Sequence, residues 1–332
     1  MAGRRTNAER PAVGPRARRR AWLEKVLLTL LTTLLTVGLA ELVARTQVPA
    51  ASFHLLYDVH PDAELGITLK ANADFEFEGV TMKLAPTRIR TTPEGHREPA
   101  VSLPASADTR RIACLGDSVV FGWGVEALET FCAHLPQRVG PGWDAVNFGV
   151  PGFNLAQTVR RFELMASRFR PDVVVLVVNQ NDAEPPLTPT RSTWSRVADQ
   201  SALVRWVLVR LTRSAAAETP TAATSVTPGA DDTLRGYLVP LKRLAERMTR
   251  TGTRWLVVFT WPAPAALVQF AVRSGAEVLD ARDVLVTPHH VIAGDGHPNA
   301  AGHAALADRI GTALGQEPRP KEGRRQRMEF DQ

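Results

Sequence analysis

The sequence lacks the motifs that usually hold metal ions or nucleotides. Its 332 residues include two cysteines, Cys114 and Cys132, and neither belongs to a CxxC pair or a cysteine–histidine cluster, which argues against a zinc site. The phosphate-binding patterns G-x-x-x-x-G-K-[ST] and G-x-G-x-x-G are also absent. We therefore expect a chain that uses no metal ion and no other cofactor.

The two cysteines do not show whether the protein is exported from the cytoplasm. Cys114 falls in an apolar segment and Cys132 in an expected helix, so both are expected to be small buried side chains. A disulfide between them is the alternative, which the sequence does not favour. Two cysteines neither support nor exclude an exported protein.

The excess of positive charge is confined to the two ends of the chain. The formal net charge is +6, and the arginines cluster in "GRR" and "RARRR" near the start and in "EGRRQR" near the end. The middle of the sequence carries mixed signs and no stripe of basic and aromatic residues. This distribution argues against a nucleic-acid partner.

One long apolar run lies near the N-terminus. Residues 21–45 read AWLEKVLLTLLTTLLTVGLAELVAR, and the run from Val26 to Ala40 holds no charge, which is near the lower length limit for a membrane-spanning helix. Seven arginines precede it, which by the positive-inside rule places the N-terminus in the cytoplasm and the bulk of the chain outside. We expect an uncleaved single-pass anchor. A cleaved signal peptide is the alternative, because small residues follow in VPAAS at 48–52.

From Arg110 onward, apolar strand segments alternate with helical segments. Strands are expected at 112–115, 145–148, 172–178, 255–260 and 277–279, and helices at 126–137, 155–168, 232–248, 263–273 and 300–314. The segment DVVVLVV at 172–178 is a continuous β-branched run, as expected of a strand covered on both faces. The alternation predicts an α/β protein, a three-layer α/β/α sandwich around a five-stranded parallel sheet.

Composition divides the chain into successive parts. We expect a basic cytoplasmic tail (1–20), the anchor (21–45), a small β-rich preface with its linker (46–108), an α/β domain (109–314) and a disordered basic tail (315–332). An insertion at 183–231 interrupts the α/β domain. It contains an apolar helix candidate, SALVRWVLVRL at 201–211, and a low-complexity stretch at 214–232.

Polar residues follow several strands of the predicted sheet. GDS at 116–118 follows the first strand, NFGVPGFN at 147–154 the second and NQND at 179–182 the third, while GDGHPNAAGH at 294–303 leads into the last helix. Parallel sheets place their sites beyond the carboxyl ends of the strands. We therefore expect these four segments to converge, although Asp117 and Ser118 alone would also suit the start of a helix.

These four segments resemble the sequence blocks of the SGNH (GDSL) hydrolases. The family pattern is GDS, then a glycine in an N-x-x-x-x-G turn, then G-x-N-D, then D-x-x-H-P; the matching blocks here are 116–118, 147–152, 179–182 and 295–298. The resemblance covers about residues 110–314. It implies the flavodoxin-like fold of that family and serine hydrolase chemistry. The anchor and the β-rich preface resemble a membrane-tethered bacterial branch.

The resemblance implies a catalytic triad. Ser118 would be the nucleophile, His297 the base that takes its proton, and Asp295 the acid that orients the imidazole. The family usually places its acid three residues before the histidine, but Gly294 stands there and Asp295 is two before. Asp295 can meet the imidazole only if its loop curls. The fallback acids are Asp280 and Asp283, and a backbone carbonyl is a further alternative.

The resemblance also implies an oxyanion hole and supporting residues. The backbone N–H groups of Ser118 and Gly152 and the side-chain amide of Asn181 would point at the developing oxyanion. Asp117 and Asp182 would support the site, with Asp117 as a hydrogen-bonding brace. Asn179 replaces the glycine of the family's third block and is expected to crowd the pocket.

The predicted function is a serine ester hydrolase that works through an acyl-enzyme outside the cytoplasm. Its expected partners are an O-acyl or O-acetyl ester of a glycan or lipid and the membrane around its own anchor. Two alternatives stay open. An O-acyltransferase would use the same triad, because a sugar hydroxyl can replace water as the acceptor. A non-catalytic polysaccharide-binding or assembly protein would keep the fold without a working triad, and the altered acid spacing is its best support.

Overall fold

The computed structural model describes residues 15–47, 53–77, 85–101, 105–106, 108–186, 201–204, 206–207 and 230–315. These residues belong to two compact units. One contains the long helix α1 (Pro15–Gln47) and residues 201–207, and the other contains the described residues from 53 to 186 and from 230 to 315. Residues 214–229 of the predicted low-complexity stretch and residues 316–332 of the predicted C-terminal tail lie outside the described residues, whereas residues 230–232 form the start of α8 (Ala230–Thr251).

A five-stranded parallel sheet forms the centre of the larger unit, as predicted. Its strands are β5 (Arg110–Leu115), β6 (Trp143–Asn147), β7 (Val173–Val178), β8 (Arg254–Phe259) and β9 (Glu277–Asp280). They lie in the order β6-β5-β7-β8-β9. The chain thus winds outward in both directions from the β5–β7 pair. Sheets of this order hold their sites where the winding direction changes, at the carboxyl ends of those two strands.

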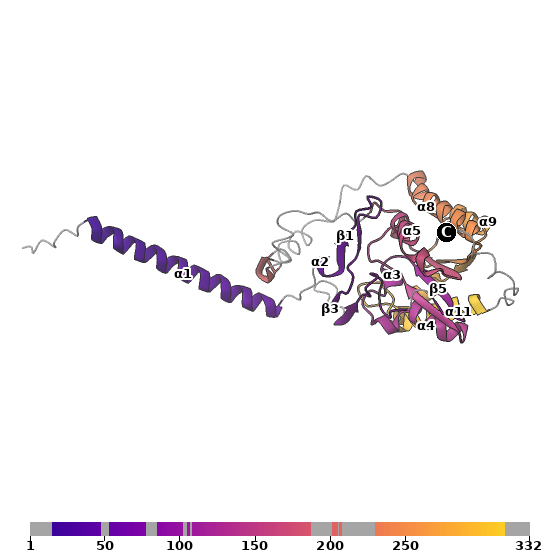
Figure 1. The fold of residues 1–332 in the computed structure, drawn as a ribbon, viewed down its shortest axis with the longest axis horizontal. Helices are drawn as coiled ribbons and strands as arrows, with labels where there is room; N and C mark the ends of the chain where they lie inside the picture. The colour runs from indigo at the N-terminus through magenta and orange to yellow at the C-terminus, as the bar shows by residue number, and fades with distance from the viewer. Residues whose placement is uncertain are drawn as a thin grey trace, which may run out of the picture. The chain divides into compact units, whose positions relative to one another are not determined.

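Helices cover both faces of the sheet, so the predicted three-layer sandwich is confirmed (Figure 1). One face packs on α5 (Leu155–Leu164), α8 (Ala230–Thr251) and α9 (Ala265–Arg273). The other packs on α3 (Ser118–Phe121), α4 (Phe131–Val139), α10 (Arg282–Leu285) and α11 (Ala300–Gly315). Alternate residues of β7 point to opposite faces, and all six are fully buried. This explains its unbroken apolar sequence.

Short helices fill the connections of the larger unit. They are α2 (Phe53–Leu56), η1 (Ala127–Glu129), η2 (Ala166–Phe169), η3 (Gln180–Ala183) and η4 (Pro288–His290). The expected helices at 126–137 and 155–168 are each split into an α-helix and a single 3₁₀ turn. The one-turn helices α3 and α10 were not predicted, because four residues are too few to show a helical period.

The preface folds into two antiparallel strand pairs that pack on the larger sheet's loops. β1 (Tyr57–Val59) pairs with β2 (Ile67–Leu69), and β3 (Asp74–Phe77) pairs with β4 (Thr87–Arg90). Buried apolar residues of the preface form one cluster with Phe121, Val150 and Phe153. The preface is therefore built onto the segments that follow β5 and β6.

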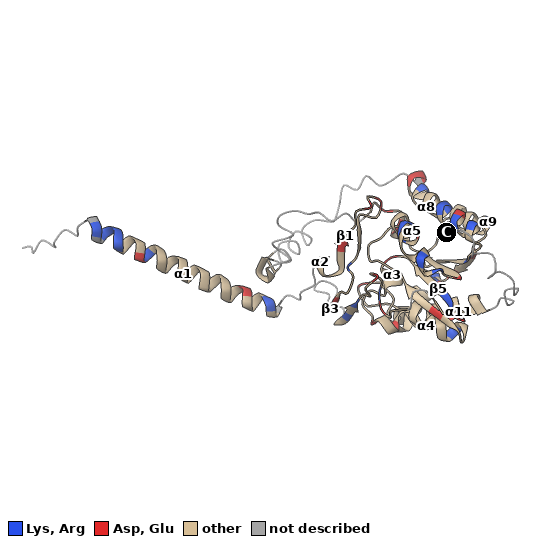
Figure 2. Cartoon of the chain, viewed as in Figure 1, with Lys and Arg blue, Asp and Glu red and all other residues tan. Residues whose placement is uncertain are grey.

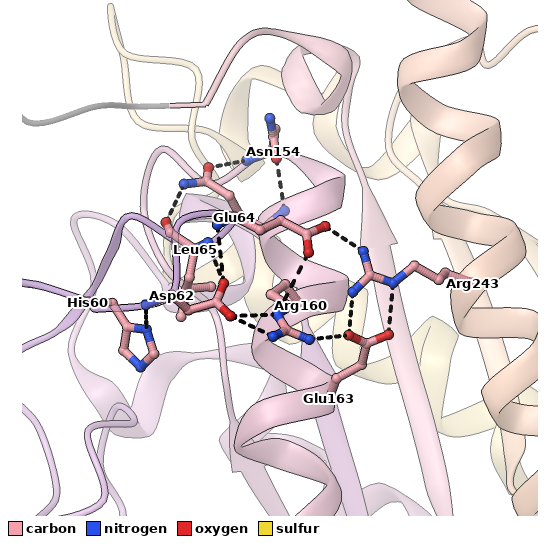
Figure 3. A network of polar contacts seen from close by, with 9 residues as sticks. His60, Asp62, Glu64, Leu65, Asn154, Arg160, Glu163 and Arg243 are labelled. Atoms are coloured by element: carbon pink, nitrogen blue, oxygen red, sulfur yellow. Dashed lines mark hydrogen bonds and ion pairs between the residues drawn. The ribbon is translucent and has the colours of Figure 1, made fainter.

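A charged network ties the preface to two helices (Figure 3). Arg160 of α5 bonds to Asp62 at 2.5 Å and to Glu163 at 3.1 Å. Arg243 of α8 bonds to Glu163 and to Glu64 of the preface. The Arg160 guanidinium lowers the pKa of Asp62 to about 2. Because the partners are partly exposed, the network fixes geometry more than it adds stability.

Cys114 and Cys132 form a disulfide, so the expectation of two unpaired buried cysteines is wrong. Cys114 is in β5, Cys132 is in α4, and their sulfur atoms are 2.12 Å apart. Both residues are nearly inaccessible to solvent. A sequence separation of 18 residues gave no sign of the pairing, because only the packing of α4 against β5 brings the two side chains together.

His303 is a buried structural residue of α11. Its Nδ1 accepts a hydrogen bond from the Phe131 N–H at 3.2 Å, and its ring stacks on Phe131. Burial, aided by nearby positive charge, lowers the pKa of His303 to about 3. The imidazole is therefore neutral in the fold, with its proton on Nε2.

This buried histidine predicts acid sensitivity. Between pH 6.5 and pH 3 the unfolded chain binds a proton at His303 that the folded chain does not, so stability falls as the pH falls through this window. The slope is at most about 1.4 kcal/mol per pH unit. Replacing His303 with glutamine keeps an acceptor for the Phe131 N–H and removes the titration. Urea unfolding at pH 7, 6 and 5 should show a smaller loss for His303→Gln than for the wild type, and no such difference for the exposed His289→Gln.

Candidate active site

Ser118 stands at the start of a helix that follows the buried strand β5. Asp117 caps this helix, because its Oδ1 accepts the Val119 N–H at 3.0 Å. Asp117 is 1% exposed, whereas Ser118 is half-buried. The capping role expected for this pair is thus present. The Ser118 hydroxyl lies 3.4 Å from Asp117 Oδ2 and also faces a second side chain.

That hydroxyl faces His297, which lies 179 residues later in the chain. Ser118 Oγ is 2.8 Å from His297 Nε2, and His297 Nδ1 is 2.5 Å from Asp295 Oδ1. For Nε2 to accept the serine proton, Nδ1 must carry the ring proton and donate it to Asp295. The three side chains therefore form one continuous hydrogen-bonded chain.

The loop before His297 curls, and this lets an acid two residues earlier reach the ring. Gly294 and Gly296 both adopt left-handed conformations, with φ of 78° and 89°, which glycine adopts without strain. The N–H groups of Asp295 and Gly296 both donate to the Ile292 carbonyl, at 3.1 and 3.0 Å. The Asp295 side chain is 1% exposed and also accepts the His297 N–H at 3.0 Å.

The fallback acids are engaged elsewhere. Asp280 pairs with Arg282 at 2.7 Å, and Asp283 pairs with Arg309. Both carboxylates are more than half exposed. Asp295 is thus the carboxylate that the structure brings to His297.

Two further segments carry the residues expected to bind an oxyanion. Gly152 lies in the turn after β6 and Asn181 lies in η3, and both are exposed. In the part of the chain that the structure describes, the N–H groups of Ser118 and Gly152 have no hydrogen-bond acceptor. Asn154 caps α5 and donates to the Glu184 carbonyl at 2.9 Å. This bond ties the turn at Gly152 to the end of η3.

Asn179 does not crowd the site, contrary to expectation, because its side chain is buried in a hydrogen-bond network. Its Nδ2 donates to Asp117 Oδ1 at 2.7 Å, and its Oδ1 accepts the Thr260 hydroxyl. Its backbone N–H donates to Asp182 Oδ2 at 2.8 Å. The network joins the ends of β5, β7 and β8. Burial raises the pKa values of Asp117 and Asp182, and the charge of Asp117 raises that of Asp182 further.

Arg97 of the preface holds the segment after Ser118. Its Nη1 donates to the carbonyls of Phe121 and Gly122 at 2.6 and 2.5 Å, and its Nη2 donates to the Val125 carbonyl at 2.6 Å. The guanidinium also lies over the Phe121 ring, 4.5 Å from its centre. Arg97 is fully buried, and burial lowers its pKa to about 10.

Tyr57 stabilises the turn that contains Gly152 in a similar way. Its buried hydroxyl donates to the Pro151 carbonyl at 2.9 Å, directly before Gly152. The sequence gave no sign of either residue's role, since both act across the fold and belong to no motif. The preface thus stabilises both the segment that follows Ser118 and the turn that contains Gly152.

No metal site accompanies these residues. Within the described ranges, no three histidine, cysteine, aspartate or glutamate side chains gather in a way that could hold a metal ion. The adjacent His289 and His290 belong to η4, and His290 Nδ1 lies 2.8 Å from the Val284 carbonyl.

The sequence matches the GDSL-like lipase/acylhydrolase family over residues 114–305. The chain belongs to this family. The match contains all four blocks described above, from the strand before Ser118 to the helix after His297.

Several known proteins share limited sequence identity with this GDSL-like protein. An acetylxylan esterase of Xylanibacter ruminicola is 24% identical over 223 residues, which are 64% of this chain and 45% of that enzyme. The chain therefore spans less than half the length of that relative. An α/β hydrolase from the metagenome of Lake Arreo is 19% identical, with a TM-score of 0.41 over 64% of this chain and 97% of its own. A lipase/acylhydrolase of Enterococcus faecalis is 14% identical, with a TM-score of 0.40 over 65% and 100% of the two chains.

Proposed function

We propose that this GDSL-like protein is a serine ester hydrolase with Ser118, His297 and Asp295 as its triad. The observation that carries the proposal is the hydrogen-bonded chain from Ser118 Oγ through His297 to Asp295. A serine hydroxyl becomes a useful nucleophile only when an adjacent base takes its proton. A buried carboxylate on the far side of the imidazole fixes the tautomer that this task needs.

The first half of the reaction forms an acyl-enzyme. Ser118 Oγ attacks the ester carbonyl while its proton passes to His297 Nε2. The carbonyl oxygen becomes an oxyanion, which the N–H groups of Ser118 and Gly152 and the amide of Asn181 stabilise. The tetrahedral intermediate collapses, the ester C–O bond breaks, and His297 gives its proton to the leaving alcohol.

The second half releases the acid. Water gives a proton to His297 Nε2 and attacks the acyl carbon, forming a second oxyanion. Collapse breaks the bond to Ser118 Oγ, which regains its proton from His297, and the carboxylic acid leaves. Asp295 stays ionised throughout and stabilises the imidazolium of each step.

We further propose that the enzyme works outside the cytoplasm on an O-acetyl ester of a glycan. The apolar stretch Arg18–Thr46 of α1 is long enough to cross a membrane, and the preceding arginines favour a cytoplasmic N-terminus. The Cys114–Cys132 disulfide favours an oxidising compartment. The substrate class is supported by the acetylxylan esterase among the relatives.

A fluorophosphonate probe and a series of p-nitrophenyl esters test this proposal on the full chain in detergent. We expect one adduct, located on the Ser118 peptide by mass spectrometry, and no adduct in Ser118→Ala. We expect the acetate ester to react at least about ten times faster than the octanoate and palmitate, because one or two kcal/mol of pocket discrimination is common. A folded protein that takes no label would favour the non-catalytic binder. Acetyl transfer to a sugar without release of acetate would favour the transferase.

A further inference from the structure

A short part of the insertion lies against the C-terminal end of α1. Near the C-terminal end of α1, Ala44 is buried, and Ala40 and Glu41 are half-buried. Ala202 of the insertion is 1% exposed. Alanines four positions apart on one helix face allow another backbone to come close. Residues 201–203 lie on the side of α1 that carries Glu41, because all three bond to that side chain.

Glu41 fastens this segment to the helix. Its Oε2 accepts the Ser201 hydroxyl at 2.8 Å and the Leu203 N–H at 3.0 Å, and its Oε1 accepts the Ala202 N–H at 3.0 Å. Arg45, one turn further along α1, bonds to Glu41 Oε1 at 3.0 Å. An acid in an apolar helix is costly unless it is paired. Here it is satisfied by the start of a second apolar segment.

The composition of that segment suits a lipid surface. SALVRWVLVRL at 201–211 combines leucine and valine with a tryptophan and two arginines. Val207 is 40% exposed and Trp206 is half-buried. Apolar residues with tryptophan and arginine are typical of helices that lie at the boundary between headgroups and acyl chains.

The distribution of charge on α1 also indicates a lipid bilayer as the partner. Its middle carries no charged side chains, and charges lie at its two ends (Figure 2). The most apolar 18-residue part of α1 contains no residue that is buried within the protein. A lipid bilayer that takes up α1 would therefore also meet the segment that Glu41 fastens to it.

We propose that residues 201–204 and 206–207 form a second membrane contact, which Glu41 holds against α1 and which lies in the interfacial layer of the bilayer. This rests on the proposed retention of α1 as an anchor. The insertion leaves the hydrolase domain shortly after the Asn181 turn and re-enters it at α8. A bilayer contact within it attaches that turn to the membrane through a second covalent path.

A fluorophore at position 207 tests the proposal. Val207→Cys in the full chain is labelled with an NBD maleimide, which spares the disulfide-bonded Cys114 and Cys132, and is placed in phosphatidylcholine–phosphatidylglycerol vesicles. We expect blue-shifted emission and at least twofold quenching by lipids with a doxyl group near the headgroup. The matched control is Val272→Cys on α9, which is 56% exposed and should keep the emission of a label in water.

A second substitution tests the hydrogen bonds by which Glu41 holds Ser201, Ala202 and Leu203. Glu41→Gln lowers the number of strong acceptor sites for Ser201, Ala202 and Leu203, and should at least halve the quenching at 207. Glu24→Gln, which removes only the exposed pair with Arg20, should leave the quenching unchanged.

Three outcomes would contradict the proposal. If the label at position 207 emits as it would in water while the protein resists carbonate extraction, the proposal is overturned and the anchor stands. A label at 207 that the lipid quenchers cannot reach, and that becomes accessible when the protein is diluted, would also overturn the proposal, since a second copy of the chain would then cover the segment. Loss of the protein on carbonate extraction would instead overturn the anchor and the proposal together.

Discussion

Replacing Asp295 with asparagine is expected to lower kcat by about 10⁴-fold with little change in KM, because the imidazole would lose both its orientation and the charge that stabilises the imidazolium. Asparagine fits the same buried position, so the curled loop should persist. The measurement is the steady-state hydrolysis of p-nitrophenyl acetate across pH 5 to 9. The loss equals about 5.5 kcal/mol of transition-state stabilisation.

The two other acids near the end of β9 provide the controls. Asp280→Asn and Asp283→Asn remove exposed carboxylates that pair with arginines, and both variants should keep wild-type kcat. Full activity in Asp295→Asn would remove Asp295 from the triad. A loss confined to Asp280→Asn or Asp283→Asn would identify the acid instead.

Replacing Arg97 with leucine is expected to destabilise the fold by about 3 kcal/mol or more, because it leaves the carbonyls of Phe121, Gly122 and Val125 without their donor. Each buried unsatisfied carbonyl costs about 1–3 kcal/mol. The same change frees the segment that follows Ser118, so kcat should fall even at temperatures where the variant is folded. Urea unfolding and ester hydrolysis on one preparation measure both effects.

Two further variants separate the hydrogen bonds of Arg97 from its charge. Arg97→Lys keeps the charge but cannot donate to three carbonyls in the fixed geometry of a guanidinium, so it should fall between the wild type and leucine. The exposed Arg168 supplies a matched surface control, and Arg168→Leu should change stability by less than about 0.5 kcal/mol. Wild-type stability in Arg97→Leu would show that the carbonyls find other partners.

The sheet could be predicted because its strands carry their own signal. A strand such as β7, covered on both faces, must be apolar along its whole length, and helices between such strands force a parallel arrangement. The preface was harder to predict. Its strands are three or four residues long, and their burial comes from loops that lie far away in the sequence.

The residues of the candidate site likewise include some that could be predicted from the sequence and some that could not. Ser118, His297 and Asp295 belong to short motifs, and the positions of these motifs, after a predicted strand and before the last predicted helix, made their convergence predictable. Arg97 and Tyr57 act on backbone carbonyls 24 to 94 residues away. A carbonyl acceptor places no demand on residue type, so neither contact leaves a pattern in the sequence. Asn179 was misjudged for a related reason, since its partners Asp117 and Thr260 come from two other strand ends.

The Cys114–Cys132 bond makes a covalent ring that contains Ser118. Closing a ring of this size removes about 3 kcal/mol of chain entropy from the unfolded polypeptide. A newly made chain gains that contribution only after thiol oxidation, so the stability of the segment around Ser118 depends on the redox state of its surroundings. Recombinant protein made in a reducing cytosol would start from the open dithiol, and purification buffers that contain a reductant would keep it in that state.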